Sequence, residues 1–148
     1  MGTWAAAAAE LSERPSPFIE SVLDLIVDGP RVYFVTEWIE GVALTELIGD
    51  GAPLPWTLVA RVVVDLLDGA RFAHERNPPL CHRGITLSAV RVSIDGAVKL
   101  TRFGVAAALA AMGEGTAQME RDGLWHPAPE LRVGGAATPK SDLYGVGA

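Results

Sequence analysis

The residues best suited to chemistry lie between Leu80 and Ala106, where a histidine and an arginine are adjacent at positions 82 and 83. A second arginine follows at position 102, directly before Phe103 and Gly104. Guanidinium groups bind phosphate and carboxylate oxygens well. This stretch could therefore contact a phosphate group or an acidic side chain.

Two short runs of alternating residues separate these basic groups. Apolar residues recur at every second position from 90 to 94 and again at 98 and 100, and Asp95-Gly96 lies between the runs. Alternation of this kind is typical of a half-buried strand, and Asp-Gly is a strong hairpin signal. The sequence predicts a β-hairpin that positions Arg102.

Composition limits the class of protein. The chain has 148 residues, 49% of them hydrophobic, with a net charge of −6 and a pI near 5.0. This favours one folded domain and argues against a nucleic-acid surface, which needs clustered basic residues. The single cysteine, Cys81, excludes an internal disulfide, fits a reducing compartment and is expected to be a small buried hydrophobe. We find no apolar run long enough for a membrane span and no credible signal peptide.

The remaining elements follow from periodicity. We expect a short helix over Trp4–Leu11, a hairpin from runs 22–27 and 31–37, a short helix over 44–48, and a long helix from Pro55 to Arg76. In the long helix, Leu58, Val62, Leu66, Gly69 and Phe72 or Ala73 form one apolar stripe. Arg61, Asp65, Asp68 and Arg71 are expected off that stripe or at its margin.

Four segments together resemble the eukaryotic-type protein kinases, in particular bacterial Ser/Thr kinases. They are YFVTEWIEG (33–41), LCHRGITLSAVRVSIDGAVKLTRFGVA (80–106), Ala-Pro-Glu (128–130) and SDLYGVG (141–147). The resemblance implies an α+β, protein-kinase-like fold that is degenerate and truncated. Residues 1–148 would form a partial domain, with 1–40 as the end of the small lobe and the hinge. Residues 41–148 would form the first part of the mainly helical large lobe, ending at the start of its central helix.

The same resemblance implies roles for individual residues. Thr36 would be the gatekeeper, and Glu37, Trp38 and Ile39 the nucleotide hinge. His82 and Phe103 would belong to the internal apolar spine, Gly104 would complete the motif of Phe103, and Arg83 would meet an acid or phosphate of the activation segment. Asp142 would tie the catalytic loop to the central helix. Glu130 would close the activation segment and pair with an arginine beyond this chain.

The residues that would carry catalysis are replaced. Gly84 stands at the position of the base, Ala89 at that of the loop asparagine, and Arg102 at that of the metal-binding aspartate. The only lysines are Lys99 and Lys140, and no Gly-rich loop precedes the hinge. A doubly charged metal about 4 Å from Arg102 would meet roughly 8 kcal/mol of repulsion at an effective dielectric near 20. We expect no magnesium and at most weak ATP binding.

Two arginines leave alternatives open. Arg102 could contact phosphates, or it could face solvent or pair with an acid, which we favour. Arg91 falls where the family has an apolar residue beneath the adenine, so it would either fill that space or turn to water. A register slip of one residue would place Val90 or Val92 there instead.

The other candidate residues have ordinary interpretations. His74 and His126 are expected to be surface or packing residues, because no second ligand stands at metal spacing in the sequence. Thr116 is a weak phosphosite candidate opposite Arg83, and Trp125 is a candidate for an interface or the core.

Our main hypothesis is a cytoplasmic pseudokinase that acts as a binding or regulatory module. The first alternative is part of a Ser/Thr protein kinase that binds ATP and phosphorylates proteins when flanking sequence completes it. The second is a non-functional gene fragment. The apolar stripe from Leu58 to Phe72 would lack most of its cover, which implies a protein partner, self-association or instability.

Overall fold

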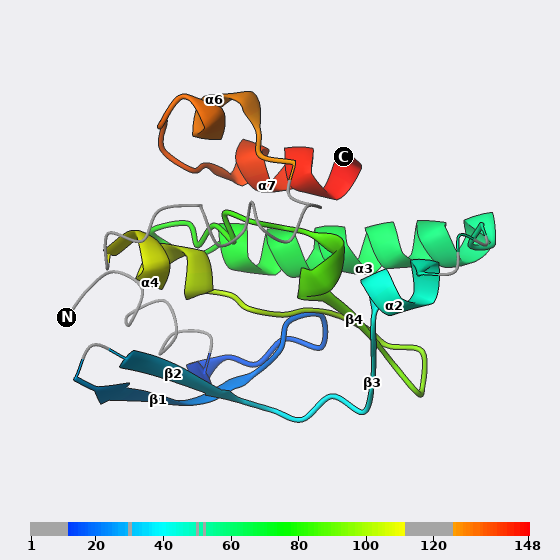
Figure 1. The fold of residues 1–148 in the computed structure, drawn as a ribbon, viewed down its shortest axis with the longest axis horizontal. Helices are drawn as coiled ribbons and strands as arrows, with labels where there is room; N and C mark the ends of the chain where they lie inside the picture. The colour runs from blue at the N-terminus through cyan, green and yellow to red at the C-terminus, as the bar shows by residue number, and fades with distance from the viewer. Residues whose placement is uncertain (1–11, 30, 50, 52, 112–125) are drawn as a thin grey trace.

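The computed structural model describes residues 12–29, 31–49, 51, 53–111 and 126–148 (Figure 1). The helix expected over Trp4–Leu11, Thr116 and Trp125 lie outside these residues. In chain order the elements are β1 (Val22–Asp28), β2 (Arg31–Thr36), β3 (Gly41–Ala43), α2 (Leu44–Ile48), α3 (Trp56–His74), the 3₁₀ turn η1 (Leu87–Ala89), β4 (Val90–Ser93), β5 (Val98–Leu100), α4 (Val105–Ala111), α6 (Pro129–Arg132) and α7 (Pro139–Gly147).

The first hairpin consists of β1 and β2, which pair antiparallel as predicted, with Leu25 opposite Phe34. Gly29 in its turn has a φ of 56°, a left-handed conformation that glycine adopts without steric cost. Most of its side chains are exposed, and the exposed fraction reaches 63% at both Leu23 and Val27. The hairpin lies on the side of the molecule opposite α7 in Figure 1.

The second sheet has the strand order β3-β4-β5, and its β4–β5 pair is the hairpin predicted around Asp95-Gly96. Gly41 permits the close approach of β3 to β4, because a Cβ there would lie 2.1 Å from the Val92 carbonyl oxygen. A parallel bridge between Ile19 and Leu100 joins the segment before β1 to this sheet. The first hairpin is thereby attached to the strands that lead to residue 102.

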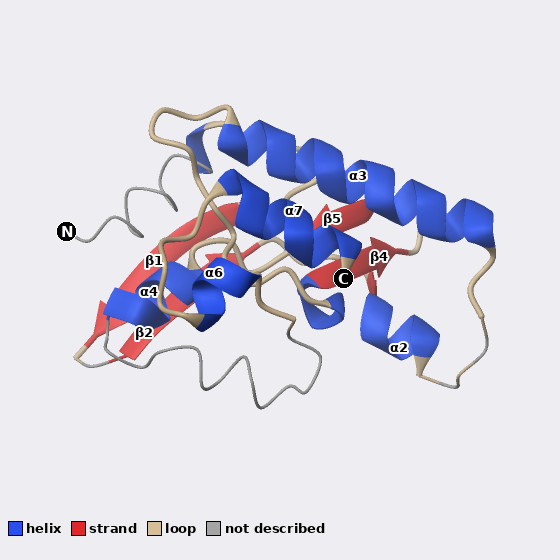
Figure 2. Ribbon diagram, turned by 90° about the horizontal axis from the view of Figure 1, so that it is seen from above, coloured by secondary structure: helices blue, strands red, loops and turns tan. Residues whose placement is uncertain are grey.

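The core forms where α3 packs on β5 and α7. Figure 2 shows α3 beside α7, and Figure 1 shows α3 between α7 and β4. Val62, Leu66 and Ala73 are buried, and Leu58 and Phe72 pack on them while half-buried. The expectation that this stripe lacks cover is therefore wrong, because the strands and α7 cover it.

The expectation that Asp65 lies off the apolar stripe or at its margin is also wrong. Asp65 lies on the buried face of α3 with an exposed fraction of 4%. Its position three residues after Val62 and four before Gly69 places it on the same helix face. Arg61 Nε lies 2.9 and 2.8 Å from its two carboxylate oxygens. The polarity of Asp65 favours a position at the margin of the apolar stripe, whereas its spacing places it on the buried face of the helix.

The last helix, α7, begins with Pro139 after a capping box formed by Thr138 and Ser141. The Ser141 hydroxyl accepts from the Thr138 backbone N–H at 3.1 Å. This start places Asp142 in the first turn, where it is buried. None of the helices in the described parts of the chain is long and apolar enough to cross a membrane.

Candidate functional site

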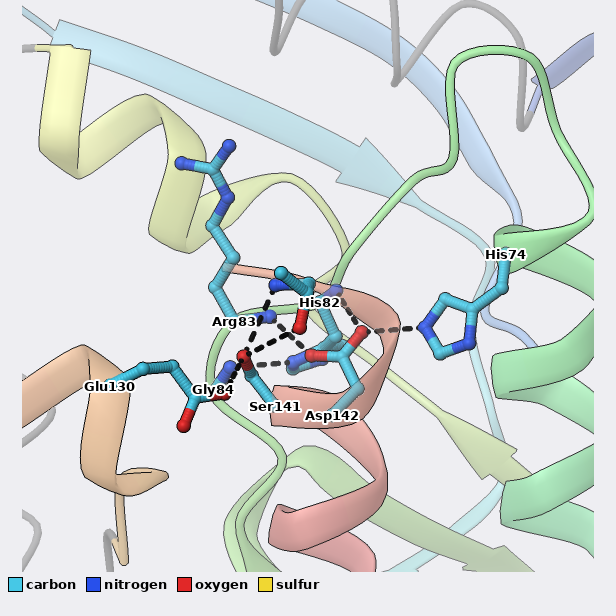
Figure 3. Close-up of polar contacts among 8 residues, drawn as sticks. His74, His82, Arg83, Gly84, Glu130, Ser141 and Asp142 are labelled. Carbon is cyan, nitrogen blue, oxygen red and sulfur yellow. Dashed lines mark hydrogen bonds and ion pairs between the residues drawn. The ribbon is translucent and has the colours of Figure 1, made fainter. Parts of the chain in front are cut away.

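The loop at His82 is held by one buried carboxylate. Asp142 Oδ2 accepts from the His82 backbone N–H and Oδ1 from the Arg83 backbone N–H, both at 2.8 Å. Oδ2 also lies 2.8 Å from His74 Nε2, and Figure 3 shows the three groups converging on Asp142 from the loop and from α3. Asp142 thus makes the predicted contact with the backbone of the loop.

The His82 ring is buried between the loop and the strand that precedes Phe103. Its Nε2 lies 2.8 Å from the Thr101 carbonyl oxygen, and its Nδ1 accepts from the Gly84 backbone N–H at 3.3 Å. This pattern fits a neutral ring with the proton on Nε2. The ring packs edge-on against Phe103 with centroids 4.9 Å apart, so the two predicted spine residues are in contact.

Burial lowers the pKa of His82 below its ordinary value. The hydrogen bond to Thr101 and the charge of Asp142 act in the opposite direction, and Arg102 lowers the pKa further. The ring is therefore a neutral structural group at physiological pH.

The three substituted positions surround the same loop. Gly84 is buried, and the Ala89 side chain is in the core with an exposed fraction of 1%. The Arg102 side chain is exposed, and its Nη1 donates to Ser88 Oγ at 3.3 Å. None of the three side chains offers a carboxylate or amide oxygen.

Glu20 connects Arg102 to the first hairpin. Its Oε2 accepts from the Arg102 backbone N–H at 3.2 Å, and its Oε1 accepts from Thr36 Oγ1 at 3.1 Å. Arg102 has a φ of 64°, which is uncommon for a residue with a side chain. Sequence reasoning missed Glu20, because its partners lie far along the chain.

The predicted hinge residues have three different environments. Glu37 bonds within the chain: its backbone N–H donates to the Ser21 carbonyl at 3.0 Å, and its Oε1 accepts from Ser21 N at 2.8 Å and Lys99 Nζ at 2.6 Å. Burial raises the Glu37 pKa, but the hydrogen bonds from Lys99 and Ser21 outweigh burial and hold the pKa below its usual value. Trp38 is 87% exposed, whereas Ile39 is buried in the core.

Arg91 points along the sheet surface toward β3. It pairs across the strands with Lys99, and its Nη2 donates to the Gly41 carbonyl oxygen at 2.7 Å. Its Nε is buried without a hydrogen-bond partner among the described residues. Val90 is buried on the opposite face of β4. The half-buried side chain thus lies along the sheet surface.

Comparison with known proteins decides the family. The family model for the protein kinase domain matches residues 7–148. This chain belongs to the protein kinase family. The kinase domain therefore covers nearly the whole chain, and the fold predicted from the motifs is confirmed.

Several Ser/Thr kinases are similar to this kinase chain. It is 34% identical over 143 residues to the serine/threonine-protein kinase PknL of Mycobacterium tuberculosis, covering 97% of this chain and 35% of PknL. It is 29% identical over 140 residues to PrkC of Bacillus subtilis, covering 95% of this chain and 21% of PrkC. The chain thus spans about a third or less of these relatives.

Solved structures agree on the fold. A crystal structure of the Mycobacterium tuberculosis PknI kinase domain matches with a TM-score of 0.71 at 21% identity. The match covers 97% of this chain and 52% of that kinase domain. The described elements are thus arranged as in about half of a kinase domain.

Three other predicted kinase motif residues have different surroundings. Glu130 Oε1 accepts from Ser141 Oγ at 2.6 Å, which lowers the Glu130 pKa and joins α6 to the start of α7. The pairing of Glu130 with an arginine stays a prediction. Arg83 has a φ of 69°, and its exposed side chain makes no ion pair among the residues that the structure describes. Gly104 is buried beside Phe103, with a φ of 84°.

The two other histidines occupy surface and packing positions. His126 is exposed, and His74, whose side chain is only 12% exposed, lies against Asp142. Cys81 is only half-buried; burial and the charge of Asp142 raise its pKa to about 11. The linear sequence could not indicate this cluster, because Asp142 joins the other two only through folding.

An apolar cavity of about 250 Å³ lies between α2, α3 and α7. Its lining includes Leu44, Val62, Leu66 and Ile85, and none of the predicted hinge residues. This cavity is therefore separate from the place where the kinase resemblance puts a nucleotide.

Proposed function

We propose that this chain is a pseudokinase, a protein kinase domain without phosphoryl transfer that acts as a binding or regulatory module. The observation that carries the proposal is the joint replacement at Gly84, Ala89 and Arg102 around one loop. Phosphoryl transfer depends on an acceptor for the hydroxyl proton and on oxygen ligands for magnesium. The loop supplies neither from these positions.

Electrostatics supports this interpretation. The exposed guanidinium of Arg102 projects where the resemblance places a metal-binding carboxylate. Magnesium prefers carboxylate and water oxygens, and a cationic side chain repels it. Magnesium is accordingly not part of the proposed function.

Nucleotide binding is proposed to be weak or absent. Arg91 reaches the Gly41 carbonyl across the sheet surface. By the kinase resemblance, this arginine stands at the position where an adenine would need an apolar floor. Lys99 is already paired with Glu37 at 2.6 Å. A purine would have to displace a half-buried arginine, which costs free energy without returning a matching contact.

The residues that persist serve the shape of the loop. His82, Phe103 and Asp142 fix the backbone between α3 and α7 through buried hydrogen bonds and ring packing. A binding module needs this shape and does not need a catalytic base. We place its action in the cytoplasm, with a protein partner or a second copy as the binding target.

A phosphorylation assay tests the proposal directly. The purified chain, radiolabelled ATP, magnesium and a generic basic protein substrate should give no incorporation above a heat-killed control. Magnesium-dependent incorporation that disappears in the heat-killed control would overturn the proposal. PknL assayed in parallel controls for the assay conditions.

The alternative of a Ser/Thr protein kinase completed by flanking sequence is favoured by the similarity to PknL and PrkC and by the intact His82 to Asp142 frame. A longer protein, expressed with any coding sequence that flanks this chain, distinguishes the completed kinase from the pseudokinase. The kinase alternative would be favoured if the longer protein phosphorylates substrate and loses this activity when Lys99 or Glu20 is replaced. Continued inactivity favours the pseudokinase.

The alternative of a non-functional fragment makes a separate prediction about folding. A fragment without function should show a broad, non-cooperative melting transition. The buried frame around Asp142 and the core on α3 instead favour a cooperative transition. Differential scanning calorimetry distinguishes these outcomes.

A further inference from the structure

Three potential metal ligands converge at the junction of α3, the His82 loop and α7. His74 is the last residue of α3, Cys81 immediately precedes the loop, and Asp142 lies in the first turn of α7. One ligand atom from each, a ring nitrogen, Sγ and a carboxylate oxygen, lies within 4.8 Å of the other two. No other such group occurs in the part of the chain that the structure describes.

The donor types suit a borderline-soft cation. Imidazole, thiolate and carboxylate are the side chains that bind zinc, with bond lengths of about 2.0–2.3 Å. Two ligands of one tetrahedral zinc therefore lie about 3.3–3.7 Å apart. His74 Nε2 and Asp142 Oδ2 are 2.8 Å apart, so a bound cation would separate them slightly and draw Sγ inward.

Asp142 can hold a cation and still anchor the loop. Its Oδ1 accepts from the Arg83 N–H, and its Oδ2 accepts from the His82 N–H and faces His74. A carboxylate has about four lone-pair positions, so a cation at Oδ2 replaces only the contact with His74. The two backbone N–H groups would then orient the carboxylate, as outer hydrogen bonds do in metal sites.

The burial of the cluster fits a small, partly open site. The Asp142 side chain is 1% exposed and that of His74 is 12% exposed, whereas Cys81 is half-buried. The carboxylate thus lies at the closed end, and water reaches the cluster from the side of the other two ligands. Water would complete a tetrahedral set from that accessible side.

We propose that His74, Cys81 and Asp142 form a zinc-binding site that joins α3, the His82 loop and α7. The cation takes the place of the hydrogen bond between His74 and Asp142, and the thiol proton leaves to solvent. The role is structural or regulatory, and it does not depend on whether the chain transfers phosphate. Figure 3 shows the His74 ring and the Asp142 carboxylate facing each other across the gap that the cation would enter.

Cobalt titration of the full chain is the direct test. Co²⁺ bound by a thiolate gives a charge-transfer band in the near ultraviolet, and its visible bands report the coordination geometry. We expect one equivalent of Co²⁺ to produce both signals and Zn²⁺ to displace it. A titration of the wild type without the thiolate band overturns the proposal.

Variants assign the ligands. Cys81→Ser should abolish the thiolate band, and His74→Gln should weaken Co²⁺ affinity by roughly tenfold or more. His126→Gln is the matched control, because His126 is an exposed histidine outside the cluster. Affinity that falls equally in His126→Gln, or a band that persists in Cys81→Ser, contradicts the assignment.

A stability measurement covers the case in which a variant folds poorly. Zn²⁺ at about 100 times its dissociation constant should shift the folding equilibrium of the wild type about 100-fold toward the folded state. Addition of EDTA should reverse the shift. An unchanged melting temperature at saturating Zn²⁺ counts against the site.

Discussion

At the scale of single residues, the groups that remain at the kinase loop have structural surroundings. His82 bonds to the Thr101 carbonyl and packs on Phe103, and Ala89 fills the core where the family has a polar side chain. Glu20 joins Thr36 to the Arg102 backbone. Each of these polar contacts supports the fold.

His82 should make stability depend on pH. Its folded pKa lies below its unfolded value of about 6.5, so the unfolded chain binds more protons once the pH falls below that value. The free energy of unfolding should be unaffected by this group above about pH 7 and should fall below it, by at most about 1.4 kcal/mol per pH unit. Urea unfolding between about pH 5 and 8 measures this slope.

The variant His82→Gln provides the comparison, because its side-chain amide can still donate to Thr101. This variant should be less stable at pH 8 but should lose less stability on acidification. His126→Gln, at an exposed position, should keep the wild-type slope. An equal slope in wild type and His82→Gln would show that another group causes the acid sensitivity.

Cys81 should react slowly with alkylating agents when EDTA keeps the chain free of metal. Burial and the Asp142 charge raise its pKa from 9.0 to about 11, which lowers the thiolate fraction about 100-fold at pH 8. Iodoacetamide should modify the folded chain roughly 100-fold more slowly than the urea-unfolded chain. Mass spectrometry of timed samples gives both rates, and equal rates would contradict the described environment.

At the scale of elements, α7 is the support of the loop. The capping box at Thr138 and Ser141 starts the helix, and Asp142 in its first turn binds two loop N–H groups and His74 of α3. Glu130 adds a bond from α6 to Ser141. Four parts of the chain thus meet at one helix start.

Loss of the Asp142 charge should therefore be costly. Asp142→Asn keeps one acceptor oxygen but places an amide NH₂ against backbone or ring N–H groups, so we expect destabilisation by about 2–4 kcal/mol. Asp68→Asn, which breaks the partly exposed pair with Arg71, should cost at most about 1 kcal/mol. Urea denaturation at pH 7.5 measures both. Equal effects would mean that the buried network contributes no more than a surface ion pair.

The sequence predicted the elements better than their contacts. Both hairpins, the helix over 44–48 and the long helix appear where alternation, turn residues and helical spacing indicated them. The predicted marginal position of Asp65 is wrong, because its spacing places it on the buried face of α3 despite its polarity. Glu20, the pairing of Lys99 with Glu37, and the proximity of His74, Cys81 and Asp142 were missed, because each depends on tertiary packing between distant residues.

At the scale of the whole molecule, the first hairpin exposes several apolar side chains. The hairpin β1–β2 exposes Leu23 and Val27, each at 63%, and Trp38 after it is 87% exposed. Within the described residues this sheet has two strands only. Apolar side chains on a strand pair with open edges favour association with another strand.

We therefore expect the isolated chain to self-associate with rising concentration. Leu23→Lys combined with Val27→Lys should shift it toward the monomer, since charge on an edge strand opposes pairing. Val133→Lys is the control, because Val133 is 84% exposed on another part of the chain. Static light scattering gives the mass of each. A wild-type monomer at every concentration, with a sharp melting transition, would refute self-association.

We propose that the kinase loop is kept for its shape and binds no magnesium nucleotide. A thermal-shift titration of the chain with ATP, with and without magnesium, is the decisive measurement. The melting temperature should not change under either condition, or should show a small shift that does not depend on magnesium and disappears in Arg102→Ala. A saturable shift that requires magnesium would refute this proposal.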